Sequence, residues 1–254
     1  MRPLLWITVA LLIVLVLGSP IIYVTYSRGI PEMSTAEEVE IAVRSWAENE
    51  RMQRFSGHQH GKVEKFELPP LAKMNRDYLA LILADAGCTD FLVEPRESDF
   101  AFFRRVVLSA ATGASGSGRA NRCDLQFCEM LASNLGFGDG IRRGLATWRI
   151  HRALSREQLL RYRVAASYFG PGIVGADSAA RRLLNMDLAS MNLAETCELY
   201  LAEYDFELIQ VCKVAAQIKK LRDQLLDMLQ RSKTIPEDEI RRARSAPVAC
   251  LRPS

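Results

Sequence analysis

Residues 154–175 read LSREQLLRYRVAASYFGPGIVG, a charged helical pattern followed by a Gly-Pro-Gly turn. Ser155 stands at an N-cap position, because Glu157 and Gln158 follow in the expected first turn of a helix. Glycine and proline then end one helix and allow the next to start in a new direction. The stretch therefore predicts two helices joined by a tight turn.

Helical periodicity continues on both sides of this stretch. Before it, Ile141, Leu145 and Trp148 recur at i, i+4 and i+7, which gives a helix one apolar face. After it, an apolar stripe with spacings of three and four predicts a long amphipathic helix, packed on the core rather than in a coiled-coil dimer. Pro236 starts a last short helix. The stripe consists of Val211, Val214, Ile218, Leu221, Leu225 and Met228.

The segments upstream also favour helices. Apolar runs at residues 79–86 and 100–108 predict two buried helices. Ser34-Thr35-Ala36-Glu37 resembles a capping box at the start of a membrane-proximal helix. The glycine-rich residues 112–119 lack the Lys and Ser/Thr of a phosphate-binding loop, so we expect a flexible loop there. With no period-two strand pattern in the sequence, we predict an all-α fold.

The amino terminus is the most apolar part of the chain. No charged residue lies between Arg2 and Arg28, and residues 4–26 are long enough to span a hydrocarbon core of roughly 30 Å. A cleaved signal peptide is the alternative, but the run continues past Gly18 without a clear A-x-A cleavage site. We therefore predict one transmembrane helix. The flanking arginines hardly decide its orientation, and an extracytoplasmic carboxyl-terminal domain is the simpler assumption.

Length and composition indicate one globular domain. We divide the chain into an anchor at 1–28, a membrane-proximal segment at 29–66, a domain at 67–248 and a tail at 249–254. The 33 basic and 30 acidic residues leave a net charge of +3, which gives no argument for a nucleic-acid partner.

The cysteines and histidines do not form a recognisable metal motif. Six cysteines permit 15 disulfide pairings in an oxidising compartment, but none forms a C-x-x-C pair. Cys123 and Cys128 lie about 140° apart on a helix, which argues against a local bridge. We favour buried, unpaired thiols. His58 and His60 favour a solvated loop, so we expect no metal and no cofactor.

Taken together, these segments resemble the peptidoglycan glycosyltransferase (transglycosylase) domain of monofunctional transglycosylases and class A penicillin-binding proteins, over residues 68–248. That family's late motif reads roughly L-S-K-x-x-I-L-E-x-Y-L-N-x-x-x-F-G-x-G-x-x-G. The resemblance continues at Ala179-Ala180, Leu193 and Glu195, and over residues 222–247. It implies a lysozyme-like, all-α domain behind the transmembrane anchor. The residues that follow the late motif are Leu154, Ser155, Arg156, Leu159, Leu160, Phe169, Gly170, Gly172 and Gly175.

The resemblance fails at the catalytic positions. Anchoring the first motif, E-D-x-x-F-x-x-H-x-G, on Phe91 places Gly87 and Cys88 where the Glu-Asp pair stands. The second motif, G-G-S-T-I-T-Q-Q-x-x-K-N, falls on CDLQFCEM at residues 123–130, with Ser133 in place of its Lys. In the third, R-K-x-x-E, Arg143 replaces the second Glu. Whether the chain is an enzyme is therefore left open.

Two nearby carboxylates are candidate substitutes for the missing acid. On a helix Asp90 lies about 60° from Gly87, which makes it a candidate catalytic acid, and Glu94 is a second one nearby. Arg104 matches a family arginine, and a basic face is a candidate for binding a diphosphate or an anionic lipid. An ordinary solvated helix face is the alternative. The basic face consists of Arg142, Arg143, Arg149 and Arg152.

Three functions follow as hypotheses. The first is a catalytically inactive glycosyltransferase-like protein that binds a lipid-linked glycan precursor, membrane lipid or cell-wall synthesis proteins. The second is an active peptidoglycan glycosyltransferase with a substituted acid. The third is a scaffold that recruits a partner protein through the stripe at residues 211–228. The resemblance implies a bacterial inner (plasma) membrane protein with a periplasmic domain.

Overall fold

The computed structural model describes residues 30, 32–53, 66, 68–112, 122–138, 140–170, 172–204 and 215–248. Within these ranges the regular structure is helical, apart from one isolated bridge between Tyr168 and Val174, so the predicted all-α class is confirmed. Among the described helices, none is long and apolar enough to cross a membrane. The expected anchor at 1–28, the loop with His58 and His60, and the tail lie outside the described residues.

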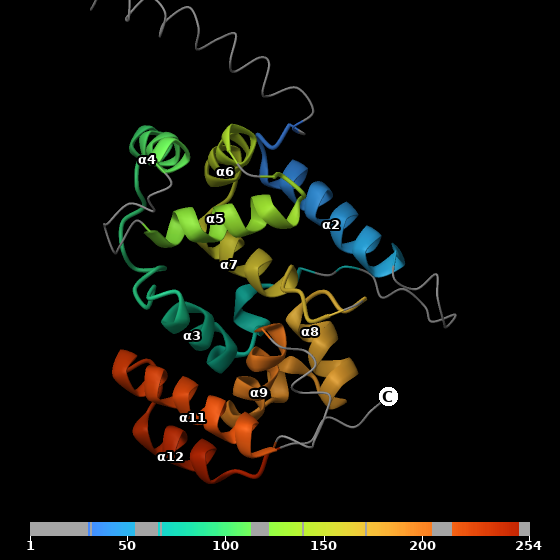
Figure 1. The fold of residues 1–254 in the computed structure, drawn as a ribbon, viewed down its shortest axis with the longest axis vertical. Helices are drawn as coiled ribbons and strands as arrows, with labels where there is room; N and C mark the ends of the chain where they lie inside the picture. The colour runs from blue at the N-terminus through green and yellow to red at the C-terminus, as the bar shows by residue number, and fades with distance from the viewer. Residues whose placement is uncertain are drawn as a thin grey trace, which may run out of the picture.

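Two groups of helices lie on either side of a central helix, α7 (Arg156–Ala165) (Figure 1). In the first group α6 packs against α4 and α5 and contacts α2. In the second, α11 packs against α3, α9 and α12. The first group comprises α2 (Ala36–Gln53), α4 (Asp99–Thr112), α5 (Arg122–Asn134) and α6 (Ile141–Ala153). The second comprises α3 (Arg76–Asp85), α8 (Ala176–Ala179), α9 (Leu193–Tyr204), α11 (Ala215–Ser232) and α12 (Glu237–Ser245).

Short turns complete the described chain. A 3-10 turn, η1 (Leu71–Lys73), precedes α3, and α8 continues into a π-helical turn, η2 (Ala180–Leu184). A second 3-10 turn, η3 (Leu188–Ser190), leads to α9. Because α7 contacts α5, α8 and η1, it connects the two helix groups.

Side-chain caps fix the starts of α7 and α2. The hydroxyl of Ser155 accepts from the amide of Gln158 (3.2 Å), whose side chain accepts from the amide of Ser155 (2.8 Å), so the predicted cap is confirmed. The box before α2 is shifted by one residue from the prediction. Thr35 Oγ1 accepts from the amide of Glu38 (3.2 Å), and Glu38 Oε2 accepts from the amide of Thr35 (3.0 Å).

The turn after α7 depends on glycine. Gly175 has φ +93°, and a Cβ added there would lie 2.9 Å from the main-chain oxygen of Ala165. The Gly175 amide donates to the carbonyl of Ser167 (2.7 Å), and the Phe169 amide donates to that of Ile173 (3.0 Å). The chain therefore folds back tightly on the end of α7 before α8 begins.

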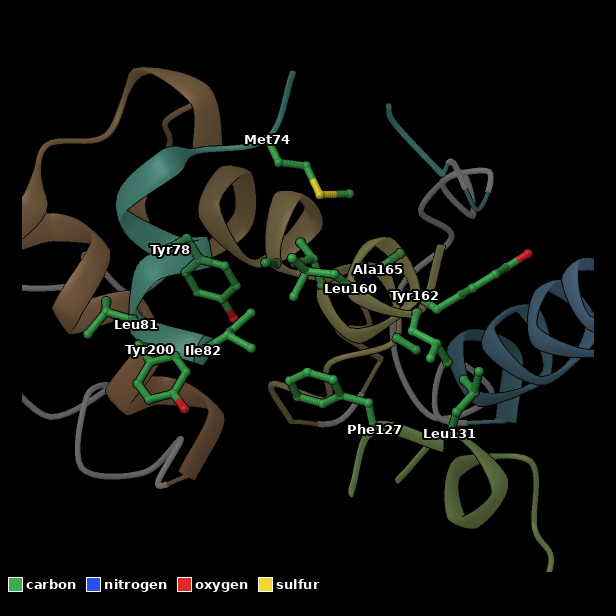
Figure 2. Close-up of a cluster of buried hydrophobic side chains, with 14 of the residues drawn as sticks. Met74, Tyr78, Leu81, Ile82, Phe127, Leu131, Leu160, Tyr162, Ala165 and Tyr200 are labelled. Atoms are coloured by element: carbon green, nitrogen blue, oxygen red, sulfur yellow. The ribbon is translucent and has the colours of Figure 1, made fainter. Parts of the chain in front are cut away.

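The core joins both helix groups through α7. Figure 2 shows Tyr78, Leu81 and Ile82 of α3 beside Tyr200 of α9, with Leu160 of α7 between this cluster and Phe127 of α5. The described part of the apolar stripe also packs against the core, as predicted for α11. Of the predicted stripe, Ile218 is buried and Leu221, Leu225 and Met228 are partly buried. Leu226 and Leu229, which are also buried on α11, were not part of the predicted stripe. Val211 and Val214 lie outside the described residues.

Candidate functional site

The loop at residues 86–94 holds the positions of the first catalytic motif. Gly87 is exposed with φ +67°, and a Cβ added there would meet no atom within 4 Å. The main-chain carbonyl of Asp90 accepts from the amides of Val93 (3.0 Å) and Glu94 (2.9 Å), which closes a tight turn. Asp90 is exposed and Glu94 half-buried, and no described residue hydrogen-bonds either carboxylate. The two candidate acids therefore lie on one loop without a described group that orients them.

A disulfide bond joins this loop to α5. Cys88 and Cys123 are bonded, with their Cα atoms 5.9 Å apart. The expectation of unpaired thiols was therefore wrong for these two cysteines and right for the buried Cys128 and Cys197. The bridge connects the first-motif position to the start of the second motif, a contact between segments 35 residues apart that spacing alone does not reveal.

A buried ion pair holds the same loop against α7. Arg156 makes bonds of 2.6 to 3.2 Å with both carboxylate oxygens of Asp124 on α5, and both side chains are buried. The same guanidinium donates to the main-chain carbonyls of Phe91 (2.8 Å) and Glu94 and lies over the Phe91 ring at 4.9 Å. Phe91 in turn packs edge-on against Phe127 at 5.0 Å. In the sequence Arg156 is only a match to the family's late motif, and its role in holding the loop at residues 86–94 was not predicted.

Arg104 and three arginines of the predicted basic face lie in different surroundings. Arg104 is exposed on α4, and Arg142 is exposed at the first turn of α6. Arg143 Nε donates to a main-chain carbonyl just before α6 (3.5 Å), whereas Arg149 Nη1 donates to that of Ile30 (3.3 Å), before α2. Two arginines of the predicted basic face therefore bond to different segments, Arg143 to the loop between α5 and α6 and Arg149 to the membrane-proximal segment.

Glu129 is an acid that sequence reasoning missed. It lies within the second-motif segment on α5 and is half-buried. Burial raises the pKa of its carboxyl, and the positive charge of Arg143 opposes that rise. The motif comparison draws attention only to the hydroxyl and amide ligands that this segment lacks. In the structure it brings a carboxyl with a raised pKa close to the arginine that replaces the family's second Glu.

His151 forms a second cluster beside the loop. Its ring is buried and stacks on Phe102 with centroids 3.7 Å apart, and Nε2 accepts from Arg96 Nε (3.2 Å). Asp99 Oδ1 lies 3.3 Å from Nδ1. Burial and then the charge of Arg96 lower the pKa of His151 to about 4, against the opposing effect of Asp124 and Asp99. His151 is therefore neutral at pH 7 and serves as an acceptor for Arg96.

Asp85, at the end of α3, faces α9 instead of the loop. Its Oδ2 accepts from the hydroxyls of Tyr200 (2.9 Å) and Tyr204 (2.8 Å). Burial raises the pKa of both tyrosines, that of Tyr204 to about 12, so both are donors at neutral pH. Next to them, Tyr78 donates to Glu203, which pairs with Arg163 at 2.5 Å. This network connects α3, α7 and α9, and we assign it to structure.

Three cavities lie away from the loop at 86–94. One of about 420 Å³ lies between α3, α9 and α12, where burial and then Glu239 raise the pKa of Asp77. A second, of about 320 Å³, borders Gly175. The third, of about 300 Å³, is lined by Trp148, Arg149 and part of the membrane-proximal segment. Within the part of the chain that the structure describes, no group of three or more His, Cys, Asp or Glu is arranged to hold a metal ion.

Comparison with known proteins gives no family for this chain. No protein-family model matches it, and a search of the curated proteins finds no significant match. The resemblance to the peptidoglycan glycosyltransferases is therefore carried by the motif positions in the sequence alone.

Proposed function

We propose that the protein is a membrane-anchored, catalytically inactive relative of the peptidoglycan glycosyltransferases, with a lysozyme-like domain that binds a lipid-linked glycan precursor. The observation that carries the proposal is the Cys88–Cys123 bridge, which joins two segments that the resemblance assigns to catalytic motifs. A structural disulfide at the position of an acidic residue stabilises the loop and supplies no general base.

The remaining motif positions support the absence of catalysis. Gly87 has no side chain, and Arg143 places a positive charge where the family has its second acid. Removal of one general base costs a factor of about a hundred to ten thousand in rate. With both acids replaced, binding is the part of the family's function that this chain is best equipped to retain.

The exposed apolar face of α4 supports action at a membrane surface. Phe100, Phe103 and Val107 recur at i, i+3 and i+7 on this helix and remain 77%, 37% and 47% exposed. Arg104 lies among them and is also exposed. An apolar helical face with a basic neighbour is typical of helices that lie in the lipid interface. A lipid-linked glycan would reach the domain from that surface.

The disulfide also supports the proposed location. Structural disulfides form and persist in oxidising compartments such as the periplasm and are rare in the cytosol. We therefore place the domain on the periplasmic side of a bacterial inner membrane, behind the single anchor expected at residues 1–28.

Two assays on the full chain in detergent test the proposal. Titration with a lipid-linked disaccharide should show saturable binding, weakened in Arg104→Gln and unchanged in Arg241→Gln, an exposed arginine on α12. A glycan-polymerisation assay on the same sample should give no product. Formation of elongated glycan strands by the wild type, but not by Asp90→Asn, would show that the protein is an active enzyme. Absence of saturable binding would show that the lipid-linked disaccharide is not its ligand.

Glu129 motivates the second candidate, an active glycosyltransferase. Burial raises the pKa of its carboxyl, which is the direction in which enzymes shift a carboxyl that serves as a general acid. Polymerisation by the wild type that disappears in Glu129→Gln but persists in Glu157→Gln, an exposed acid on α7, would favour this candidate. The scaffold hypothesis stays a prediction. Ile218 of the stripe is buried, and Leu221, Leu225 and Met228 are only partly buried against the core. Val211 and Val214 lie outside the described residues.

A further inference from the structure

The third cavity lies between α6 and the membrane-proximal segment. Its lining consists of Glu32, Met33, Ser34, Trp148, Arg149 and Arg152. Its volume of about 300 Å³ is roughly ten times the space of about 30 Å³ that one water molecule takes in the liquid. The Arg149 bond to the carbonyl of Ile30 holds the two walls together. The cavity is therefore built from segments far apart in the sequence and is large enough for a small polar group.

Its lining carries charges of both signs. Arg149 and Arg152 supply two guanidinium groups, and Arg152 lies 5.0 Å from the centroid of the Trp148 ring. Asp99 Oδ2 lies 3.8 Å from Arg152 Nε and balances part of this charge. Glu32 adds an exposed carboxylate. The lining therefore matches a ligand with an anionic and a cationic end better than a simple anion.

Ser34 does not contribute to this match, since its amide and hydroxyl both donate to Glu38 Oε2 at 2.7 Å. The charged groups of the lining are the carboxylate of Glu32, the guanidinium group of Arg152 and that of Arg149, which also bonds to Ile30. The buried indole nitrogen of Trp148 has no hydrogen-bond partner among the described residues. Guanidinium groups form strong charge-assisted hydrogen bonds with phosphate, and a carboxylate forms them with an ammonium group.

The position of the cavity indicates where the ligand comes from. Trp148 packs edge-on against Phe103 at 5.3 Å, so the cavity adjoins the exposed apolar face of α4. Ile30, whose carbonyl accepts from Arg149, precedes the lining residues Glu32 to Ser34 and follows the expected membrane anchor by two residues. Tryptophan and arginine at such a junction are typical of the headgroup layer of a bilayer.

We propose that this cavity binds the headgroup of a membrane phospholipid that carries both a phosphate and a primary amine, as phosphoethanolamine does. Arg149 and Arg152 bind the phosphate, and Glu32 binds the ammonium group. The assignment rests on the membrane attachment in the proposed function but not on glycan binding or on catalysis.

Phosphorus NMR of short-chain lipids with the full chain in a phosphate-free maltoside tests the proposal. The phosphorus resonance of dihexanoyl phosphatidylethanolamine should broaden in a saturable way as the protein is added. It should broaden more strongly than the resonances of the matched phosphatidylglycerol, of phosphatidylcholine and of inorganic phosphate. Loss of one charged hydrogen bond at about 1.5 to 3 kcal/mol corresponds to roughly a tenfold loss of affinity or more, which is expected for Arg152→Gln. Arg241→Gln is the matched control and should bind like the wild type.

Glu32→Gln separates the two halves of the proposal. It should leave phosphatidylglycerol binding intact and abolish the preference for phosphatidylethanolamine. If Arg152→Gln binds the lipid as tightly as the wild type does, this cavity is not the lipid site. The same conclusion follows if inorganic phosphate binds as tightly as the lipid. If Glu32→Gln still prefers phosphatidylethanolamine, Glu32 does not bind the ammonium group of the lipid. Because no glycan is present, failure here leaves the disaccharide titration of the proposed function unaffected.

Discussion

Gly175 shows how one residue fixes the turn after α7. Its φ of +93° strains any residue with a side chain, and an added Cβ would lie 2.9 Å from the main-chain oxygen of Ala165. Positive φ alone costs about 1 to 3 kcal/mol, and the backbone contact adds to it. We expect Gly175→Ala to lower the free energy of unfolding by about 3 kcal/mol or more, measured by urea denaturation.

Gly136→Ala is the control for this prediction. Gly136 shares the positive φ, at +81°, but a Cβ there meets nothing within 4 Å. Its substitution should therefore cost only the backbone part, about 1 kcal/mol. Equal losses in the two variants would show that the contact with Ala165 carries no strain.

The buried pair of Arg222 and Glu198 leads to a second prediction. Arg222 Nη1 lies 2.8 Å from Glu198 Oε1, the two side chains are 0% and 2% exposed, and Arg222 Nη2 donates to the carbonyl of Ala246 (2.6 Å). Arg222→Met removes the positive charge that is paired with the buried carboxylate of Glu198 and should lower the free energy of unfolding by about 3 to 5 kcal/mol in urea denaturation. The double variant Arg222→Met/Glu198→Leu should recover most of that loss.

Arg242→Gln serves as the comparison, because its pair with Asp238 is exposed and contributes little. A double variant that is less stable than Arg222→Met would show that the bonds of Arg222 to the chain after α12 matter more than the charge pair.

Single residues were predictable from sequence where their partners are local. The cap at Ser155 was read correctly because Gln158 lies only three residues away. Arg222, in contrast, was seen only as part of the family's closing segment, because Glu198 lies 24 residues earlier. The pairing of Arg156 with Asp124 and the cluster around His151 were not predicted for the same reason, because their partners are far apart in the sequence. Long-range polar partners depend on the packed fold, which periodicity does not specify.

At the scale of elements, the disulfide is the main addition to the helix pattern. It fastens the loop after α3 to the start of α5 across 35 residues. Because the bond restricts the unfolded chain, closing a loop of that length should raise the free energy of unfolding by about 4 kcal/mol. We expect the double variant Cys88→Ala/Cys123→Ala to lose most of this in urea denaturation, and the wild type to lose it when reduced.

The free thiols provide the control for the disulfide. Cys128→Ala and the wild type should respond to reductant alike, because Cys128 is buried and unpaired. A wild-type unfolding midpoint that is the same with and without reductant would contradict a stabilising bridge.

Helices were predicted more reliably than their ends. The run at residues 100–108 became α4, which extends from Asp99 to Thr112, and the box before α2 moved to Thr35 and Glu38. A shift of this size is expected, since neighbouring Ser and Thr compete for the same cap. The stripe on α11 was predicted in part, because a regular spacing specifies one face of a helix. Ile218 is buried as expected, but Leu221, Leu225 and Met228 are only partly buried, and the fully buried face continues through Leu226 and Leu229.

At the scale of the whole molecule, the candidate site was only partly predictable. The sequence argument selected Asp90 by treating residues 85–91 as helical, which is wrong, because α3 ends at Asp85 and Asp90 lies on a loop with Glu94. Nor did the sequence reveal that a disulfide bond and Arg156 hold that loop. Arg143 and Arg149 lie on one helix, yet they bond to segments before α6 and before α2. The two arginines have different partners because of the way neighbouring helices pack around α6. The spacing of residues on one helix does not specify that packing.

The junction of α4, α6 and the loop at 86–94 also makes the stability of the whole chain depend on pH. His151 has a pKa of about 4 in the folded protein, below the 6.5 expected when unfolded. Above pH 6.5 it is neutral in both states and its contribution is complete. As pH falls from 6.5 to about 4 the unfolded chain binds the proton first, so the free energy of unfolding decreases.

Urea denaturation at several pH values between 4 and 7 measures this slope. We expect His151→Gln to be less stable at pH 7, because the ring stacked on Phe102 is lost, and to show a flatter slope below pH 6.5. Arg96→Gln should flatten the slope in part, because the charge that helps to lower the pKa of His151 is removed. His58 and His60 remain in all three proteins, so differences between the curves report on His151. Parallel curves for the wild type and His151→Gln would show that this histidine titrates normally and that the junction does not exclude its charged form.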